Sequence, residues 1–408
     1  MTAAEKILMK TLVGSSIDSR DWNGIQAGLR DRAFISSQVQ SAKILYAARE
    51  LSAKHAAGGA DLSKIRMEMR KALADSGYKP DPEIAGTIKD LTSQARLDVI
   101  IKTNVAQARG YVQWLDANTP GGYAHAPAQE LYRAQDRKQK RAWDKRWEAA
   151  GGKTYGGRMI ALKDDPIWVK ISRFGNPFPP FDWGSGMSVR NVSAREAIQL
   201  GLITKDDFKA KVLEKETVQK EGKRPCMNDN FFADVPFKGN TPEMQKLKDA
   251  FGDQITHEDG RIMWRGSIIR DKFNAHKDFE LNLGKPTNDL IAKLPPGTER
   301  MLKSKTFKVH GSWFDKPNEE DGTSHRKHFG ENETRKENIP LTDGDLDLFP
   351  TLWRHPDRVV MGGTGKTIKL ELDTFDGGTL TTVINIARTP EIKTLYKKLA
   401  GVGLGAST

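Results

Sequence analysis

The chain has 408 residues and carries 65 Lys or Arg against 53 Asp or Glu, which gives a formal net charge of +12 and a pI near 9.5. This length predicts two or three domains with a hydrophobic core, and the positive charge favours a partner that carries phosphates. The single cysteine, Cys226, excludes an intramolecular disulfide framework and a cysteine-rich zinc site. No signal peptide and no run of 18 apolar residues occurs. We therefore expect a soluble protein, made in a reducing cytoplasm, that has no contact with a membrane.

The first 150 residues predict a mostly helical region. One helix face is predicted by a spacing of three or four residues in the series Leu97, Ile101, Val105, Ala108 and Val112. Further amphipathic helices are expected over 62–73 and after Asp21-Trp22. Residues 133–146 hold seven Lys or Arg, with Trp143 and Trp147 four residues apart. This pattern is typical of a basic helix whose tryptophans either face nucleic acid or, more commonly, pack inside the protein.

The next segment predicts a short strand over 167–171, because apolar and polar residues alternate there. A loop follows at 174–187. Its three prolines and three glycines exclude a regular element, and its four aromatic residues predict an ordered, packed loop. Ser193 is expected to cap a helix that ends at Gly201. Residues 205–265 carry many charges with little periodicity and are interpreted as a connector, in part helical.

After residue 266 the pattern predicts a mixed α/β domain. The expected elements are a helix over 286–294, a strand over 307–314, a helix over 343–349 that Thr342 caps and Pro350 stops, and a hairpin of strands 367–372 and 380–387. No nucleotide-binding fingerprint and no cluster of metal ligands occurs in the sequence. We therefore expect no cofactor and no metal.

The segment with the most suggestive chemistry is Ser324-His325-Arg326-Lys327-His328. Imidazoles transfer protons near neutral pH, and cations stabilise charge that develops on phosphate oxygens, so these residues suit a phosphodiester reaction without a metal. Arg388-Thr389 follows the second hairpin strand and could face this segment across a cleft. From the residues alone, the 324–328 segment could also be a solvated basic loop, and Arg388-Thr389 could also be an ordinary solvated strand end.

Residues 20–200 resemble the MuF-type minor head proteins of tailed bacteriophages. The likeness is carried by Asp21-Trp22, Lys102-Thr103-Asn104 with Ala106, Ala108 and Gly110, the block Trp168 to Met187, Arg190, Arg195-Glu196-Ala197 and Leu200-Gly201-Leu202. Many relatives have Pro-Pro-His-x-x-Cys-x-Cys where this chain has Pro179-Pro180-Phe181-Asp182-Trp183, so the metal site of those relatives is not expected here. The resemblance implies a low-copy virion component inside the capsid, near the portal protein and the packaged DNA, that acts in head morphogenesis and genome delivery.

Residues 270–398 are similar to the barnase–EndoU–colicin–RelE-like nuclease domains that phages fuse behind such head proteins. The likeness is carried by Lys327-His328-Phe329-Gly330, Ile339-Pro340-Leu341-Thr342, Asp345, Leu348-Phe349-Pro350, His355-Pro356-Asp357, the hairpin and Ala387-Arg388-Thr389. That superfamily cleaves RNA without a metal, because a base helps the ribose 2′-OH attack the neighbouring phosphate and a 2′,3′-cyclic product forms. The resemblance implies that His328 or His325 is the base or acid, that Lys327 or Arg388 serves the phosphate, and that Ser324 or Thr389 positions it.

These observations predict an α+β multidomain protein. The expected parts are a mostly helical head-protein domain over 1–204, a charged connector over 205–265, and a small nuclease-like α+β domain with an antiparallel sheet over 266–408. The expected function is that of a phage minor head protein with a metal-independent ribonuclease effector domain, which can leave the particle with the DNA and reach the host cytoplasm. The alternative is a purely structural protein that binds portal and DNA and whose C-terminal domain is inactive.

Overall fold

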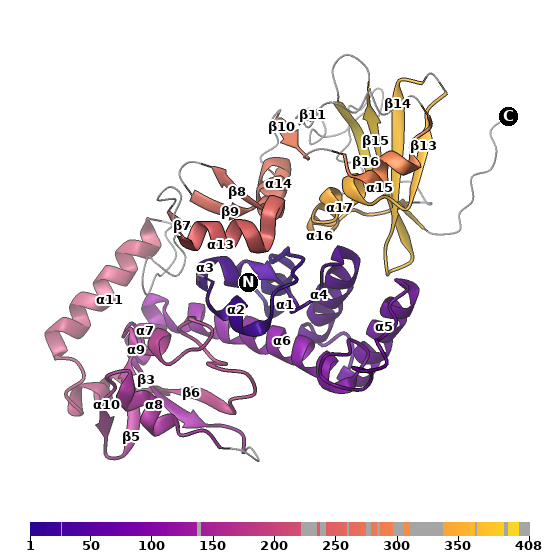
Figure 1. The fold of residues 1–408 in the computed structure, drawn as a ribbon. Coiled ribbons are helices and arrows are strands. Elements are labelled where there is room, and N and C mark those ends of the chain that lie inside the picture. The colour runs from indigo at the N-terminus through magenta and orange to yellow at the C-terminus, as the bar shows by residue number, and fades with distance from the viewer. Residues whose placement is uncertain are drawn as a thin grey trace.

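The computed structural model describes residues 1–25, 27–136, 140–221, 235–236, 242–258, 261–274, 279–283, 286–296, 306–309, 338–363, 365–386 and 391–399. Over these residues the protein mixes helices with mainly antiparallel sheets (Figure 1). The mixed α/β character that the sequence predicts is confirmed at this level. The division into domains at residues 204 and 265 stays a prediction.

Helices dominate the N-terminal part, in which α4 and α6 pack together. The elements are α1 (Ala3–Leu8), β1 (Thr11–Leu12), α2 (Ser19–Asn23), α3 (Ala27–Asp31), β2 (Ala33–Phe34), α4 (Ala42–Ala56), α5 (Leu62–Asp75), α6 (Gln94–Ala117) and α7 (Pro120–His125). Side chains of Ser41, Asp61 and Ser93 accept backbone N–H groups at the starts of α4, α5 and α6. The predicted face of α6 is confirmed, since its series is buried except for the half-buried Val112.

A small α/β lobe follows, at the lower left of Figure 1. It contains β3 (Ala128–Arg133), α8 (Trp143–Ala149), β4 (Thr154–Tyr155), β5 (Arg158–Leu162), α9 (Ile167–Lys170), β6 (Met187–Val192) and α10 (Ala194–Gln199), with strand order β4-β5-β3-β6. The expectation of a helical region up to residue 150 is therefore wrong at β3. Ser193 caps α10 as predicted.

The strand predicted over 167–171 is also wrong, because these residues form the helical turn α9. Asp165 accepts the backbone N–H of Ile167 at 2.8 Å. Ile167, Trp168 and Ile171 are all buried in one hydrophobic cluster. A single helical turn buries positions i, i+1 and i+4 together, so a short alternating pattern fits it as well as it fits a strand.

The loop 174–187 is packed, as its aromatic residues predicted. The Phe178 ring lies 5.6 Å from Tyr111 and 6.0 Å from Trp114 of α6, measured between ring centroids. Phe181 stacks on Trp168 with centroids 6.0 Å apart. Gly110 of α6 allows this contact, since a Cβ atom there would lie 1.9 Å from the carbonyl oxygen of Pro179.

The stretch expected to be a connector contains regular structure. Its elements are α11 (Lys205–Lys220), β7 (Val235–Pro236), α13 (Pro242–Phe251), the 3₁₀ turn η1 (Gly252–Gln254), β8 (Ile255–Glu258) and β9 (Arg261–Trp264). Trp264 donates its indole N–H to the carbonyl of Leu29 at 2.8 Å. The side-chain amide of Gln254 exchanges two hydrogen bonds of 2.8 Å with the backbone of Gly14. The hairpin of β8 and β9 therefore packs against the N-terminal part.

The C-terminal part is built on one sheet with the strand order β10-β11-β16-β15-β14-β13, and β12 also pairs with β16. Its elements are α14 (Arg265–Asn274), β10 (Phe279–Asn282), α15 (Asn288–Lys293), β11 (Thr306–Val309), β12 (Asn338–Ile339), α16 (Asp343–Leu346), α17 (Phe349–Arg354), β13 (Arg358–Met361), β14 (Thr367–Asp373), β15 (Gly378–Asn385) and β16 (Glu391–Leu399). All pairs are antiparallel except β11 with β16. Leu290 of α15 and Leu352 of α17 belong to the core cluster of this sheet.

Most predicted C-terminal elements are confirmed, with one correction. The helix over 286–294 exists as α15, and the hairpin exists as β14 and β15. The predicted strand 307–314 is confirmed as β11 up to Val309, and the rest of it lies outside the described residues. Pro350 does not stop a helix but stands in the first turn of α17. A proline has no N–H to donate, and the first turn of a helix requires none.

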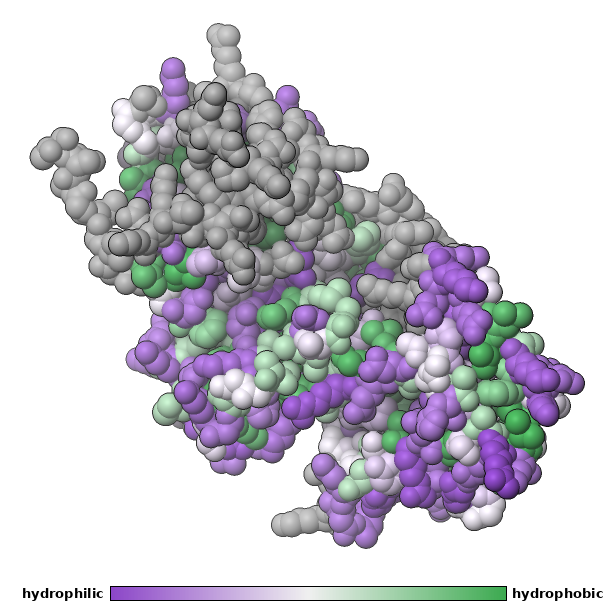
Figure 2. Space-filling model, turned by 180° about the vertical axis from the view of Figure 1, so that it is seen from behind, coloured by the Kyte–Doolittle hydropathy of each residue, from purple (hydrophilic) through white to green (hydrophobic). Residues whose placement is uncertain are grey.

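On the face drawn in Figure 2, the coloured residues are mostly hydrophilic, with hydrophobic residues in several groups. Exposed large apolar side chains are spread over distant elements, among them Met67, Leu213 and Val360. Among the described residues, no helix is long and apolar enough to cross a membrane.

The variant Gly110→Ala tests the contact between α6 and the loop 174–187. We expect a loss of about 1–3 kcal/mol in the free energy of unfolding, because the new methyl group meets a backbone carbonyl that cannot rotate away. Gly121→Ala in α7 is the control, because nothing lies within 4 Å of a Cβ atom there. Urea unfolding measures both. Equal stabilities of Gly110→Ala and the parent chain would contradict the contact.

Candidate functional site

The six residues predicted to act in catalysis lie outside the described residues. Ser324, His325, Lys327 and His328 belong to the stretch 310–337, and Arg388 and Thr389 to the stretch 387–390. Their convergence on one pocket therefore stays a prediction.

The described residues that flank these two stretches are neighbours in the sheet. Lys308 of β11 pairs with Glu391 of β16. One stretch begins directly after Val309, and the other ends directly before Glu391. Neighbouring strands lie about 4.8 Å apart. The chain therefore enters the first stretch and leaves the second at adjacent points of the sheet.

Other residues that carry the nuclease resemblance contact the N-terminal helices. The Asp345 carboxylate accepts hydrogen bonds from the Tyr46 hydroxyl at 2.9 Å and from Lys397 at 3.0 Å. Burial, followed by the charge of Asp345, raises the pKa of Tyr46. Asp357 accepts from Lys43 of α4 at 2.5 Å. His355, also part of the likeness, pairs its Nδ1 with Asp289 at 3.3 Å and is exposed.

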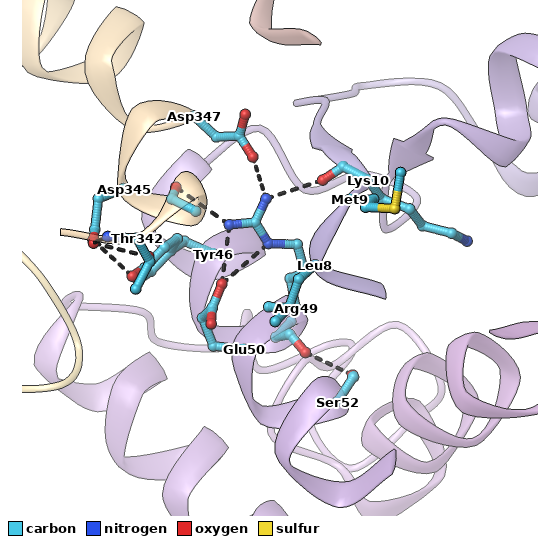
Figure 3. Close-up of polar contacts among 12 residues, drawn as sticks. Leu8, Met9, Lys10, Tyr46, Arg49, Glu50, Ser52, Thr342, Asp345 and Asp347 are labelled. Atoms are coloured by element: carbon cyan, nitrogen blue, oxygen red, sulfur yellow. Dashed lines mark hydrogen bonds and ion pairs between the residues drawn. The ribbon is translucent and has the colours of Figure 1, made fainter. Parts of the chain in front are cut away.

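A buried ion pair lies at the centre of this junction (Figure 3). Arg49 of α4 is fully buried and pairs with the Oδ2 atom of Asp347, which also accepts a hydrogen bond of 2.5 Å from Arg270 of α14. Arg49 further donates to the Lys10 carbonyl at 3.0 Å and to Glu50. Burial acts to lower the pKa of Arg49, but Asp347 and Glu50 outweigh it and the pKa is raised. Arg49 and Arg270 thus bind the same carboxylate oxygen of Asp347, and three distant segments of the chain meet at this atom.

The basic segment 133–146 has its tryptophans inside the protein. Trp143 and Trp147 are 2% and 0% exposed, so the packed alternative is confirmed. Arginines surround the buried Asp182 of the loop 174–187: Arg146 lies 3.0 Å away, Arg141 3.8 Å and Arg173 3.9 Å. Arginines and packed aromatic rings thus hold this loop.

Segments that carry the head-protein resemblance meet at one pocket, although they are far apart in the sequence. We call it the front pocket, and its lining includes Trp22, Thr103, Asn104, Phe174, Asn176 and Trp183. Lys10 and Arg30 add positive charge to the lining. Lys10 Nζ lies 3.5 Å from Asn104 Oδ1, which is a weak contact for a buried ammonium group.

Lys10 is a buried cation that sequence reasoning missed, because a lone lysine at the end of a short helix is usually solvated. Burial lowers the pKa of Lys10 to about 8; Asp31 acts against this shift, and Lys6 acts with it. Burial likewise lowers the pKa of Arg30 to about 10. Both shifts have burial as their largest cause, and the Asp31 carboxylate also lines the front pocket.

Within the described part of the chain, no group of three or more His, Cys, Asp or Glu could hold a metal ion. The chain matches no protein-family profile, no curated protein and no solved structure.

The variant Lys10→Met tests the burial of this amine. In the unfolded chain the pKa is 10.5, so between pH 8 and 10.5 the unfolded state binds more protons and stability rises with pH. Removing the amine should therefore stabilise the protein by about 1–3 kcal/mol at pH 7, and this gain should shrink towards pH 10. Denaturant unfolding at both pH values measures it. The half-exposed Lys54→Met is the control, and a pH-independent gain for Lys10→Met would contradict the assignment.

The variant Asp347→Ala tests the central ion pair. It leaves the buried Arg49 and Arg270 without their shared carboxylate, and we expect a loss of about 3–5 kcal/mol in unfolding free energy. Glu68→Ala removes the partner of Lys54 in a surface pair and should cost at most about 1 kcal/mol. Similar losses of unfolding free energy for the two variants, measured with urea, would show that the buried pair contributes no more to stability than the surface pair.

Proposed function

We propose that the protein is a minor head protein of a tailed bacteriophage and that its C-terminal α+β part is a metal-independent ribonuclease. The observation that carries the first half is the front pocket, because it brings Trp22, Thr103-Asn104 and the 174–183 segment together. These residues are spread over about 160 positions of the sequence. Because they line one pocket, the likeness belongs to one place in the folded chain. The proposal includes a position near the portal and the packaged DNA.

Two features of the sheet support the second half. It is mainly antiparallel, as the resembled nuclease domains require, and the flanks of both candidate stretches are adjacent through Lys308 and Glu391. In the proposed reaction, one histidine of His325 and His328 takes the proton of the ribose 2′-OH as its oxygen attacks phosphorus. The bond from phosphorus to the 5′-oxygen breaks, and the other histidine protonates that oxygen. Lys327 or Arg388 stabilises the charged phosphate, which Ser324 or Thr389 positions.

A second candidate function is a structural role in which the C-terminal part is inactive and the protein binds DNA. It is favoured by the arginines around Asp182. Three guanidinium groups share one carboxylate there, so the loop presents excess positive charge on rigid supports. Such a surface would bind DNA without regard to sequence and with strong salt dependence.

The deciding experiment is a ribonuclease assay on the full chain in the presence of a chelator. The full chain is required, because Asp347 of the C-terminal part shares a buried ion pair with Arg49 of α4. We expect cleavage with 2′,3′-cyclic ends, and a loss of roughly 10²-fold or more in the double variant His325→Ala/His328→Ala.

The matched control is His55→Ala/His125→Ala, which removes two histidines with no assigned role and should keep full activity. Undiminished cleavage by the first double variant would refute the assigned histidines. No cleavage by the parent chain at any pH, together with salt-sensitive DNA binding, would favour the structural role.

A further inference from the structure

The strand β6 forms one edge of its sheet. It stands last in the order β4-β5-β3-β6, and among the described residues it pairs only with β3. The backbone N–H of Ala134 donates to the carbonyl of Gly186, just before β6, so the even-numbered residues of this strand direct their backbone groups towards β3. The backbone groups of Val189 and Asn191 therefore point outwards, and no described residue hydrogen-bonds them there. Such an edge can pair with another extended chain.

A pocket that we call the edge pocket opens beside this strand. It has a volume of about 510 Å³, which lies within the range of ligand sites. The strand contributes Val189 and Asn191 to the lining, β3 contributes Gln129, and α6 contributes Gln113 and Trp114. None of the lining residues belongs to the front pocket or to the proposed nuclease group.

Three side-chain amides of this lining have no hydrogen-bond partner among the described residues. Gln129 and Asn191 lie opposite each other in neighbouring strands, so their side chains share one face of the sheet. Gln113 lines the pocket from α6. Gln113 and Asn191 are exposed, whereas Gln129 is only 6% exposed and forms part of the floor. The Gln129 amide is not among the unpartnered polar atoms that the protein encloses completely, so a ligand in the pocket can reach it.

The formal charges of the lining balance. Lys163 is one cation and Asp116 is one carboxylate. The guanidinium group of Arg190 donates to both oxygens of Glu130 at 2.9 and 2.7 Å, so its charge is already compensated. A ligand is therefore selected by hydrogen bonds and not by charge. Each side-chain amide offers donors and an acceptor side by side, and peptide groups and other amides match that pattern.

We propose that the edge of β6 binds an extended peptide of a partner protein, which adds a strand to the sheet and places a glutamine side chain in the edge pocket. The peptide backbone makes the hydrogen bonds that Val189 and Asn191 leave open. The glutamine amide pairs with Gln129 at the floor and with Gln113 on α6. Its methylene groups pack on Val189 and Pro179, which are half-buried.

A second copy of the chain fits this edge less well than a peptide. Two β6 strands paired symmetrically about Arg190 would place the two guanidinium groups opposite each other, and like charges in that position are unfavourable. The edge pocket shares no residue with the proposed nuclease group, so this proposal does not depend on the ribonuclease activity.

The test uses the full chain and three capped peptides. The first is Lys-Thr-Val-Thr-Gln-Thr-Val-Thr-Lys, in which glutamine and both valines lie on one face of the extended chain. The second is N-methylated at the glutamine, and the third has glutamate in place of glutamine. Fluorescence anisotropy of the labelled peptides measures binding. We expect saturable binding of the first peptide and binding about three- to tenfold weaker for each of the others, because one loses a backbone donor and the other an amide donor.

Two variants connect binding to this site. Val189→Pro removes an outward N–H group that takes no part in the pairing with β3, so an edge strand tolerates it, and peptide binding should weaken about tenfold. Gln129→Met removes the amide at nearly constant volume and should weaken binding of the first peptide about three- to tenfold, without loss of stability. Gln199→Met in α10 is the matched control and should bind like the parent chain.

Four results would overturn the proposal. The first is no saturable binding of the glutamine peptide at millimolar concentration, and the second is equal binding of the N-methylated peptide. The third is unchanged binding by both Val189→Pro and Gln129→Met. The fourth is a dimer of the parent chain in sedimentation that Val189→Pro dissociates, which would show that a second copy occupies the edge.

Discussion

The burial of the Arg49 guanidinium group constrains the rest of the structure. A cation that is 0% exposed needs a carboxylate, and Asp347 lies 298 residues further along the chain. Taking two charges out of water is costly, and removing one partner of such a pair is more costly still. The N-terminal helices and the C-terminal sheet therefore stabilise each other. Arg270 contacts the same oxygen and adds α14, which follows directly after the hairpin of β8 and β9. An activity in the sheet would consequently depend on the front helices, even though none of the proposed catalytic groups comes from them.

The parts of the fold that sequence predicted correctly depend on residues close together in the chain. The spacing along α6, the cap Ser193 and the hairpin of β14 and β15 are each determined within a few residues. The errors at 167–171 and at Pro350 are also local, because a five-residue alternation and a proline each suit two structures. No local pattern in the sequence predicts the ion pair of Arg49 with Asp347, because the two residues are 298 positions apart. Arg49 did leave a signal, since it stands four residues after the buried Leu45, on the apolar face of α4.

The candidate sites show the same limit. Residue types alone suggested the chemistry of the 324–328 segment, because imidazoles transfer protons and cations stabilise phosphate charge, but a solvated basic loop has the same composition. Its geometry depends on how β11 and β16 pair, and sequence could not supply that register. The front pocket was missed for a different reason. Trp22, Thr103-Asn104 and the 174–183 segment were each part of a likeness, but Lys10 stood outside it, and only folding brings Lys10 beside Asn104. The lowered pKa of Lys10 is caused chiefly by burial in the assembled site, which no pattern in the sequence contains.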